Sequence, residues 1–286
     1  MNGPKLACPN LCRDVIKMKS FALDHGFNGI EWTLSPGDLP RNLLDEKRFV
    51  NAMSRLAPLE IRYHLFFPGH ELGHTDAAKA RSAKHLFYKA VALVAKLSGR
   101  HATMHVGLGR DSMEEISWER TIAGLRDVAA KARQSGIRIC LENLVRGWTG
   151  RPNLYEKLIR KTGCWGTLDT GHAHVCASVT NQAYDVEDFA LPHPERILSA
   201  HIYHEETMAG HIPPARSSDL EDRLLLLQGL PLCDWWVLEL LEEPALLQTL
   251  YCVREFLQEF SCVPAKENAT RSTPESSQRM AVVSRE

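Results

Sequence analysis

Eight short apolar runs follow one another from residue 5 to about residue 260, and a longer segment separates each run from the next. Several of these longer segments repeat apolar residues at intervals of three and four, the spacing of a helix with one buried face. Strands that alternate with helices pair in parallel through right-handed crossovers. We expect helices at 77–97, 118–135, 154–161 and 244–260, and strands at 5–8, 29–33, 61–66, 102–106, 137–142, 165–169, 198–204 and 235–240.

Eight such units favour closure into a single (β/α)8 TIM barrel, an α/β fold that typically needs ~250 residues. The chain has 286 residues, and we place the barrel domain at 1–262. The alternative is an open doubly wound sheet, but no glycine-rich phosphate loop follows the first strand. Residues 263–286 are polar and without a period, and we expect them to form a disordered tail.

The bulk composition argues against several classes of protein. A formal net charge of −1 gives no overall positive field for a polyanion, although a local basic groove would not show in the total. Long basic loops with interleaved aromatic residues are not evident either, so we do not expect duplex DNA as a partner. Four of the eight cysteines lie inside apolar runs (Cys140, Cys164, Cys233 and Cys252), and the Cys8/Cys12 pair has no second pair to complete a zinc-binding set. The start of the chain does not have the pattern of a signal peptide, and no apolar run is long enough to span a membrane. We therefore expect a cytoplasmic protein.

Acidic and histidine side chains recur near the C-terminal ends of the expected strands. In a closed barrel these ends converge on one face, which is where TIM-barrel enzymes carry their active sites. A single strand histidine is usually a hydrogen-bonded core residue, but a buried unpaired carboxylate is expensive, and a group at almost every strand end argues against chance. Mixed oxygen and imidazole donors suit zinc, manganese, iron or cobalt better than calcium. The residues concerned are Glu31, His64, His105, Glu142, Asp169, His172, His201 and Glu239.

The segments LEN, LDTGHAH, AHIYH and VLEL occur in this order in the chain. Together they resemble the xylose isomerase-like barrels, and the resemblance extends over residues 5 to about 260. That superfamily includes sugar and sugar-phosphate isomerases and epimerases, and the endonuclease IV type of apurinic endonuclease. The resemblance implies a central metal held by Glu142, Asp169, His201 and Glu239.

The endonuclease IV type binds further metals, and the resemblance implies that His64, His105, His172 and His211 would be the additional ligands here. The family's last ligand pair is Asp-x-His, whereas this chain has Ala209 at the position of the aspartate. Glu205 and His204 are the candidate substitutes. Members that cleave small-molecule phosphodiesters, such as cobamide-remodelling enzymes, are a further branch that the chain is similar to.

Two enzyme mechanisms fit these residues. In the first, clustered metals, most naturally zinc, hydrolyse a phosphoester, with Glu142 bridging two ions and with His172 and His211 holding a further ion against the phosphate. In the second, one manganese or cobalt ion polarises a sugar while Glu142 and Glu239 exchange a proton with a carbon next to a carbonyl. Retention of both His64 and His105 favours hydrolysis. A non-catalytic barrel that binds a ligand is a third possibility, but it predicts lost metal ligands.

The residues that would contact a small phosphorylated or sugar substrate are less clearly marked. One cationic cluster, formed by Arg110, Arg146, Trp148 and Arg151 after the fourth and fifth strands, either binds a small anionic ligand or is a solvated loop. Glu31 and His172 would bind substrate hydroxyls in the isomerase mechanism, where Trp32, Phe66 and Trp148 would stack on the sugar. The leucine-rich segment 217–234 is expected to be a short amphipathic helix that packs on the core, with a homodimer contact as the alternative.

Overall fold

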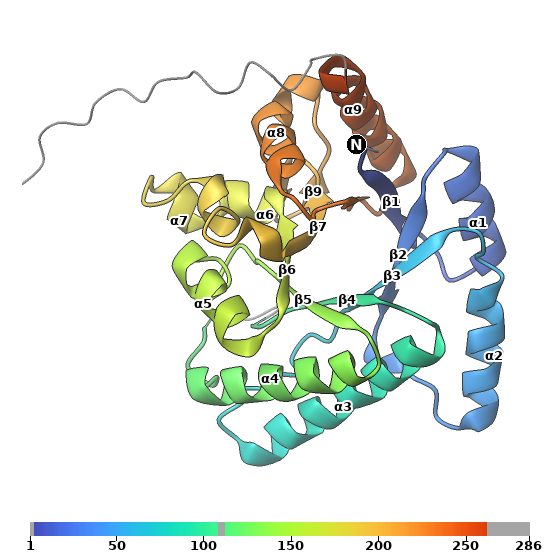
Figure 1. The fold of residues 1–286 in the computed structure, drawn as a ribbon, viewed down its shortest axis with the longest axis vertical. Coiled ribbons are helices and arrows are strands. Elements are labelled where there is room, and N and C mark those ends of the chain that lie inside the picture. Colours follow the sequence, from blue (N-terminus) through green and yellow to red (C-terminus); the bar gives the residue numbers. More distant parts are fainter. Residues whose placement is uncertain (1–2, 108–111, 262–286) are drawn as a thin grey trace, which may run out of the picture.

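The computed structural model describes residues 3–107 and 112–261, and these form a closed barrel of eight parallel strands surrounded by helices (Figure 1). Around the barrel the order is β1-β10-β7-β6-β5-β4-β3-β2. Each barrel strand therefore lies between the barrel strands that precede and follow it in the chain, and β10 closes the barrel by pairing with β1. The predicted TIM barrel is confirmed. The strands are β1 (Lys5–Pro9), β2 (Gly29–Leu34), β3 (Glu60–Leu65), β4 (His101–Met104), β5 (Arg138–Glu142), β6 (Trp165–Asp169), β7 (Ile197–Ile202) and β10 (Trp235–Leu238).

Helices follow most strands and lie on the outside of the barrel (Figure 1). In α4 the Ser117 hydroxyl accepts from the backbone N–H of Arg120 and caps the first turn, and Gly136 leaves the helix with a positive φ of 71°. Residues such as Leu125, Val128 and Ala132 form its buried stripe. The helices are α1 (Val15–Asp24), α2 (Leu43–Ser54), α3 (Ala77–Lys96), α4 (Trp118–Gln134), α5 (Pro152–Thr162), α6 (Thr170–Val175), α7 (Ala177–Thr180), α8 (Glu221–Gly229) and α9 (Glu243–Ser261).

Four 3-10 turns and one hairpin complete the described chain. The hairpin comes directly after β7 and lies against α6, at the C-terminal end of the barrel. In the leucine-rich segment Leu220, Leu224 and Leu227 are buried, so this run packs on the core as expected. These elements are η1 (Pro36–Asp38), η2 (Val186–Phe189), η3 (Pro194–Arg196) and η4 (Ser217–Asp219), with β8 (Glu205–Thr207) and β9 (Gly210–Ile212) forming the hairpin.

The end of the barrel at which the strands begin is filled by side chains and closed. The Trp235 ring occupies the interior, the guanidinium of Arg62 lies 4.5 Å from its centroid, and Arg62 forms ion pairs with Glu60 and Asp234 at 3.1 Å. Gly29 makes room for this packing, because a Cβ there would lie 2.4 Å from the Trp235 ring and 2.1 Å from the Glu60 carbonyl oxygen. The open end of the barrel is therefore the C-terminal one, where the acidic and histidine side chains lie.

Seven cysteines in the described part of the chain are free, and all but Cys12 are buried. Within residues 3–107 and 112–261, no helix combines the length and apolar character that a membrane span requires. The tail expected at 263–286 and Arg110 of the expected cationic cluster lie outside the described residues.

Candidate metal centre

The C-terminal ends of six barrel strands, together with α6 and the β8–β9 hairpin, bring the predicted metal ligands to one face of the barrel. Within the described residues, four groups of side chains have donor atoms close enough to one another to hold a cation. Three of the groups are connected, because Glu142, His64 and His201 each belong to two of them. The group of His172, Glu206 and His211 shares no residue with these three. The groups are Glu142/Asp169/His201/Glu239, His64/His105/Glu142, His172/Glu206/His211 and Glu31/His64/His201.

The central group contains the four ligands that the resemblance implied. His201 Nδ1 lies 3.0 Å from Glu239 Oε2, 3.3 Å from Glu142 Oε2 and 3.9 Å from Asp169 Oδ2. Glu142, Asp169 and His201 are 1% exposed or less, whereas the Glu239 side chain is 15% exposed. Glu239 is therefore the member of this group that solvent and a bound molecule can reach.

His64 and His105 form the second group with Glu142. Their Nε2 atoms are 3.2 Å apart, and the same Glu142 oxygen lies 3.5 Å from His64 Nε2 and 3.2 Å from His105 Nε2. The strand that was expected to end at residue 106 ends at Met104, two residues earlier. His105 therefore lies just after β4 rather than within it. The Glu142 carboxylate thus faces both the outer histidine pair and the central group.

The third group corrects one sequence expectation. His172 and His211 both approach Glu206, at 3.8 Å and 2.9 Å from its Oε2, so Glu206 rather than Glu205 or His204 lies beside the two histidines. The reason is the register of the hairpin, in which Glu206 is the direct cross-strand partner of His211. The ring of His204 instead faces the Arg223 guanidinium, at 3.3 Å.

Backbone and side-chain hydrogen bonds hold these ligands in place. Asp169 ends β6 and caps α6, its Oδ1 accepting from the backbone N–H of His172 at 2.7 Å. The Asn143 side chain accepts from the Asp169 N–H and donates to its carbonyl, both at 2.8 Å. The Tyr203 hydroxyl donates to Asp169 Oδ2 at 3.1 Å, and its ring stacks on His211 with centroids 3.8 Å apart. Sequence reasoning did not identify Asn143 or Tyr203 as supports.

Burial and charge shift the pKa values of the central residues in opposite directions. Burial opposes ionisation of Glu142, but His105 and His201 outweigh it and hold the pKa of Glu142 well below its usual range. Burial also opposes protonation of His201, yet Glu239 and Glu142 raise its pKa well above the usual value. Burial raises the pKa of Asp169 to about 6. The charges of Glu142 and Glu239 act in the same direction, and His172 acts against them.

The outer histidines show the same competition. Burial and the neighbouring His105 lower the pKa of His64, whereas Glu142 raises the pKa of His105 against the effect of burial. Burial lowers the pKa of His211, but its contacts with Glu206 and Glu239 raise it to about 10. The cluster therefore needs positive charge next to its carboxylates, which either protons on histidines or a cation can supply.

Several polar atoms in the cluster are buried and make no hydrogen bond, although they lie at ion-pair distance from one another. Buried donors and acceptors are normally satisfied, so each such atom needs an explanation. Nitrogen and oxygen atoms that converge on one point without facing each other along hydrogen bonds fit ligands of a cation, and the residue types suit a transition metal. The atoms are Glu142 Oε2, His201 Nδ1 and Glu239 Oε2.

The residues predicted to bind substrate lie in different environments. Trp148 packs against Trp118 with ring centroids 5.0 Å apart, and Arg146 and Arg151 are exposed on the same loop after β5. Glu31 is buried below the histidines, at 3% exposure. The expectation that Trp32 stacks on a sugar is wrong, because alternation along β2 turns Trp32 outward into the core while Glu31 points inward.

Phe66 is an exposed aromatic residue beside the cluster, which is the environment that stacking on a substrate requires. Its side chain is 41% exposed, and its ring meets those of His64 and His105 edge-on at centroid distances of 6.4 Å and 6.3 Å. An exposed aromatic ring beside the outer histidine pair gives the site an apolar wall.

Comparison with known proteins places this chain in a family. An uncharacterised protein of Methanocaldococcus jannaschii is 26% identical over 170 residues, 58% of this chain and 71% of that protein. Among solved structures, D-allulose 3-epimerase from Methylomonas sp. has a TM-score of 0.69 at 16% identity, over 90% of this chain and 100% of that one. Endonuclease IV from Thermus thermophilus has a TM-score of 0.62 at 17% identity, with the same coverage. The family model described as xylose isomerase-like TIM barrel matches residues 20–247, and the chain belongs to that family.

Proposed function

We propose that this protein is a metal-dependent phosphoesterase that holds more than one divalent ion, most naturally zinc, and acts on a small phosphodiester. The observation that carries the proposal is the shared position of Glu142. One of its oxygens lies within 3.5 Å of His64, His105 and His201, so a single carboxylate joins the central group to a second complete donor group. A site for one ion has no need of the second group.

The four central ligands, the His64/His105 pair and the His172/Glu206/His211 group would hold the ions. Bound there, divalent ions supply Lewis-acid activation of water and neutralise phosphate charge. Glu239 is the carboxylate open to the substrate, and its pKa of about 2, which His201 lowers against the effect of burial, keeps it ionised as a partner for a cation. Glu142 is 1% exposed and acts as a ligand.

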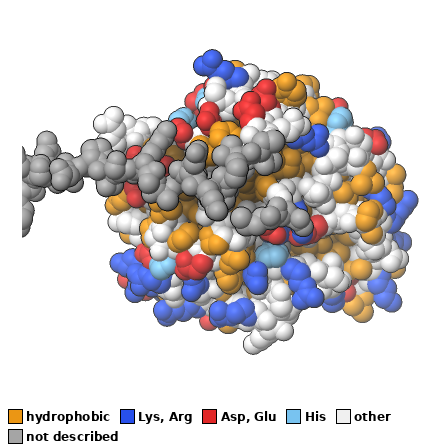
Figure 2. All heavy atoms as spheres, turned by 45° about the horizontal axis from the view of Figure 1, so that its top comes forward, with side chains coloured by type: hydrophobic (Ala, Val, Ile, Leu, Met, Phe, Trp, Pro, Cys, Tyr) orange, Lys and Arg blue, Asp and Glu red, His pale blue; other side chains and the backbone are white. Residues whose placement is uncertain are grey.

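The surface supports a small substrate rather than a long polyanion. Lys, Arg, Asp and Glu side chains are interspersed over the face in Figure 2, in line with the net charge of −1. We assign the Phe66 ring to the apolar part of the substrate. Arg146 and Arg151, exposed after β5, are proposed to meet the phosphate, and Trp148 to hold their loop through Trp118.

The second candidate is a sugar epimerase that uses one divalent ion, manganese or cobalt. Its support is the set of similar structures, which includes the D-allulose 3-epimerase and an L-ribulose 3-epimerase that covers 92% of this chain with a TM-score of 0.67. In that mechanism Glu142 and Glu239 would exchange protons with the sugar. The low exposure of Glu142 favours the hydrolase instead, because a proton-exchanging carboxylate must reach the substrate.

One experiment separates the two candidates. Protein loaded with zinc, manganese or cobalt is assayed for 4-nitrophenolate release from bis(4-nitrophenyl) phosphate, and for deuterium uptake from D2O into D-allulose and L-ribulose. We expect phosphodiester cleavage without deuterium uptake. A double variant His64→Ala/His105→Ala should lose one ion per chain and about 10–100-fold or more of the rate. The control, His85→Ala on the exposed side of α3, should keep both.

Deuterium uptake without phosphodiester cleavage would overturn the proposal in favour of the epimerase. Full metal content and activity in the His64/His105 double variant would overturn the multinuclear site.

A further inference from the structure

Glu31 is a buried carboxylate that lies beneath the candidate ligands and is not one of the four central ones. It points from β2 into the barrel, and its register partner on β3 is Arg62, whereas His64 pairs with Thr33. Glu31 therefore lies one inward-facing layer deeper than His64. At 3% exposure it is out of reach of a substrate, and a buried carboxylate without partners would be costly.

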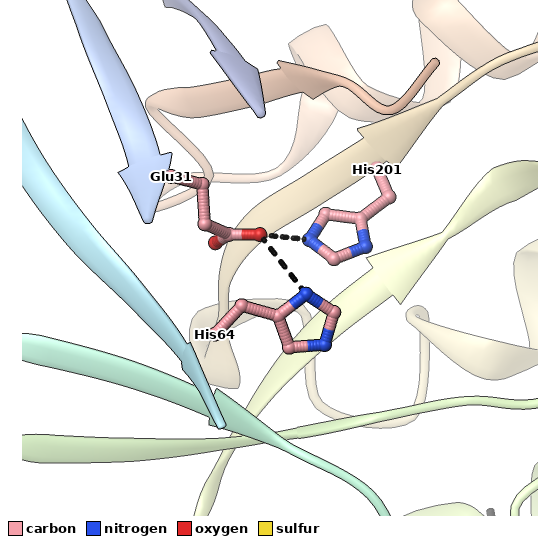
Figure 3. A group of neighbouring side chains, drawn as sticks. All are labelled: Glu31, His64 and His201. Atoms are coloured by element: carbon pink, nitrogen blue, oxygen red, sulfur yellow. Dashed lines mark ion pairs between the residues drawn. The ribbon is translucent and has the colours of Figure 1, made fainter. Parts of the chain in front are cut away.

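The partners of Glu31 are two histidines from different donor groups (Figure 3). Glu31 Oε2 lies 2.7 Å from His201 Nε2 and 3.7 Å from His64 Nδ1, and both rings turn one nitrogen toward this oxygen. His64 Nδ1 also lies 3.6 Å from Glu239 Oε1, and the opposite nitrogen of each ring faces other candidate ligands. His201 Nδ1 lies 3.0 Å from Glu239, and His64 Nε2 lies 3.5 Å from Glu142.

The second oxygen of Glu31 is held from below. The Thr103 hydroxyl approaches Glu31 Oε1 at 3.5 Å and meets the Thr167 hydroxyl at 3.0 Å, which in turn meets the Ser199 hydroxyl at 2.8 Å. These side chains come from β4, β6 and β7, so a line of hydroxyls crosses the barrel interior under the cluster and restrains the carboxylate.

We infer that Glu31 is a positioning residue shared by two metal ions: its negative charge holds the outer N–H of His201, at 2.7 Å, and that of His64, at the longer distance of 3.7 Å, and so fixes which nitrogen of each ring binds metal. Metal-ligating histidines commonly donate their second N–H to a carboxylate, which sets the tautomer and the ring orientation. Here one carboxylate serves two histidines, which links the geometry of the central ion to that of the His64/His105 ion. The inference rests on the metal binding in the proposed function, but on no particular reaction.

Two other roles for Glu31 are less consistent with these contacts. The role expected from the sequence, binding of substrate hydroxyls, requires access that a residue beneath the histidines does not have. A role as direct ligand of a further ion with His64 and His201 would require both nitrogens of each ring to bind metal at once.

Metal affinity is the first test. Glu31→Gln keeps the shape but removes the charge that holds the two N–H groups. We expect this variant to bind the central and His64/His105 ions about 10–100-fold more weakly in zinc competition titrations and to change the visible spectrum of the cobalt-loaded protein. The ion at His172/Glu206/His211 should bind as in wild type, as an internal control. Glu60→Gln, on the neighbouring strand at the closed end, should leave all ions unchanged.

The second test uses the wild-type protein, so it does not depend on how the variant folds. Long-range 1H–15N correlation spectra of the 113Cd-loaded chain report which histidine nitrogen carries the proton and which couples to the metal. We expect a proton on His201 Nε2 and His64 Nδ1, with metal on the other nitrogens. The reverse tautomers, unchanged affinities in Glu31→Gln, or loss of a whole ion from that variant would each overturn the inference.

Neither readout involves substrate. Failure of the phosphodiester assay with these metal results intact would overturn only the proposed reaction. A chain that binds no metal would overturn both.

Discussion

Glu206 and Glu205 are adjacent in the chain, but only Glu206 faces the two histidines of the third group. Its Oε2 lies 2.9 Å from His211 Nε2, and its exposed fraction of 32% leaves it open toward the cluster. Glu206→Gln should therefore remove one ion per chain, or weaken its binding by at least tenfold, since an amide is a poorer ligand for transition metals than a carboxylate. Glu205→Gln is the matched control and should keep the ion. Metal content after equilibrium dialysis measures both, and equal loss or equal retention in the two variants would contradict the assignment.

The convergence of the four central candidate ligands could be predicted from the sequence, whereas the position of Glu206 beside His211 could not. Glu142 and Asp169 each end a strand, and His201 lies in one, so barrel closure alone brings them to one face. The partner of His211 depends instead on the turn between β8 and β9. A motif comparison looks for an acid at position 209, but the observed register pairs His211 with position 206. Register is set by turn geometry, and the sequence alone does not mark which turn forms.

At the scale of elements, the hairpin of β8 and β9 is the structure that brings Glu206 to His211. Its turn residues Met208 and Ala209 are followed by Gly210 with a φ of 101°, a conformation typical of a bulge after a tight turn. A Cβ at Gly210 would touch no atom within 4 Å, so Gly210→Ala should cost only the backbone strain, about 1–2 kcal/mol. We expect the ion at His172, Glu206 and His211 to bind about tenfold more weakly, because the strain would shift the hairpin.

The control for this prediction is Gly229→Ala at the end of α8, where a Cβ also meets nothing within 4 Å and φ is not positive. Zinc titrations of both variants measure the effect. A Gly210→Ala protein that binds its ions as tightly as the Gly229→Ala protein would show that the turn does not control the site.

The alternating pattern also predicted most elements but misplaced several ends. The strand expected at 102–106 ends at Met104 and the one expected at 198–204 ends at Ile202, since the backbone there leaves the sheet to place ligands. Apolar residues such as Val106 and Tyr203 are buried whether they are in a strand or in the loop after it. Hydrophobicity therefore reports burial, and it cannot locate the residue at which pairing stops.

At the scale of the whole molecule, His101 at the closed end of the barrel makes stability depend on pH. Burial, helped by Arg62 and Arg138, lowers its pKa from 6.5 to about 4, and its Nδ1 makes no hydrogen bond. Between these pH values the unfolded chain binds a proton that the folded chain does not, so the free energy of unfolding falls as pH drops from 6.5 toward 4. His101→Gln should lose less stability between pH 7 and pH 5 than wild type.

Urea unfolding in the presence of a chelator, followed by tryptophan fluorescence, measures this difference without a contribution from bound metal. His85→Gln, on the exposed side of α3, should keep the wild-type pH dependence. An equal slope in wild type and His101→Gln would exclude His101 as the source.

Metal removal should lower the stability of the whole barrel, because the ligands come from strands all around it. Ions that bind only the folded chain stabilise it by about 2.7 kcal/mol at a concentration 100 times Kd, which corresponds to roughly 5–10 °C in melting temperature for a domain of this size. Asp169→Asn separates this effect from local structure, since asparagine also caps helices and should preserve α6 while weakening the central ion. We expect EDTA to lower the melting temperature of wild type and added zinc to restore it, with a smaller response in Asp169→Asn. Equal responses in the two proteins would mean that the zinc which stabilises the fold binds somewhere other than the central group.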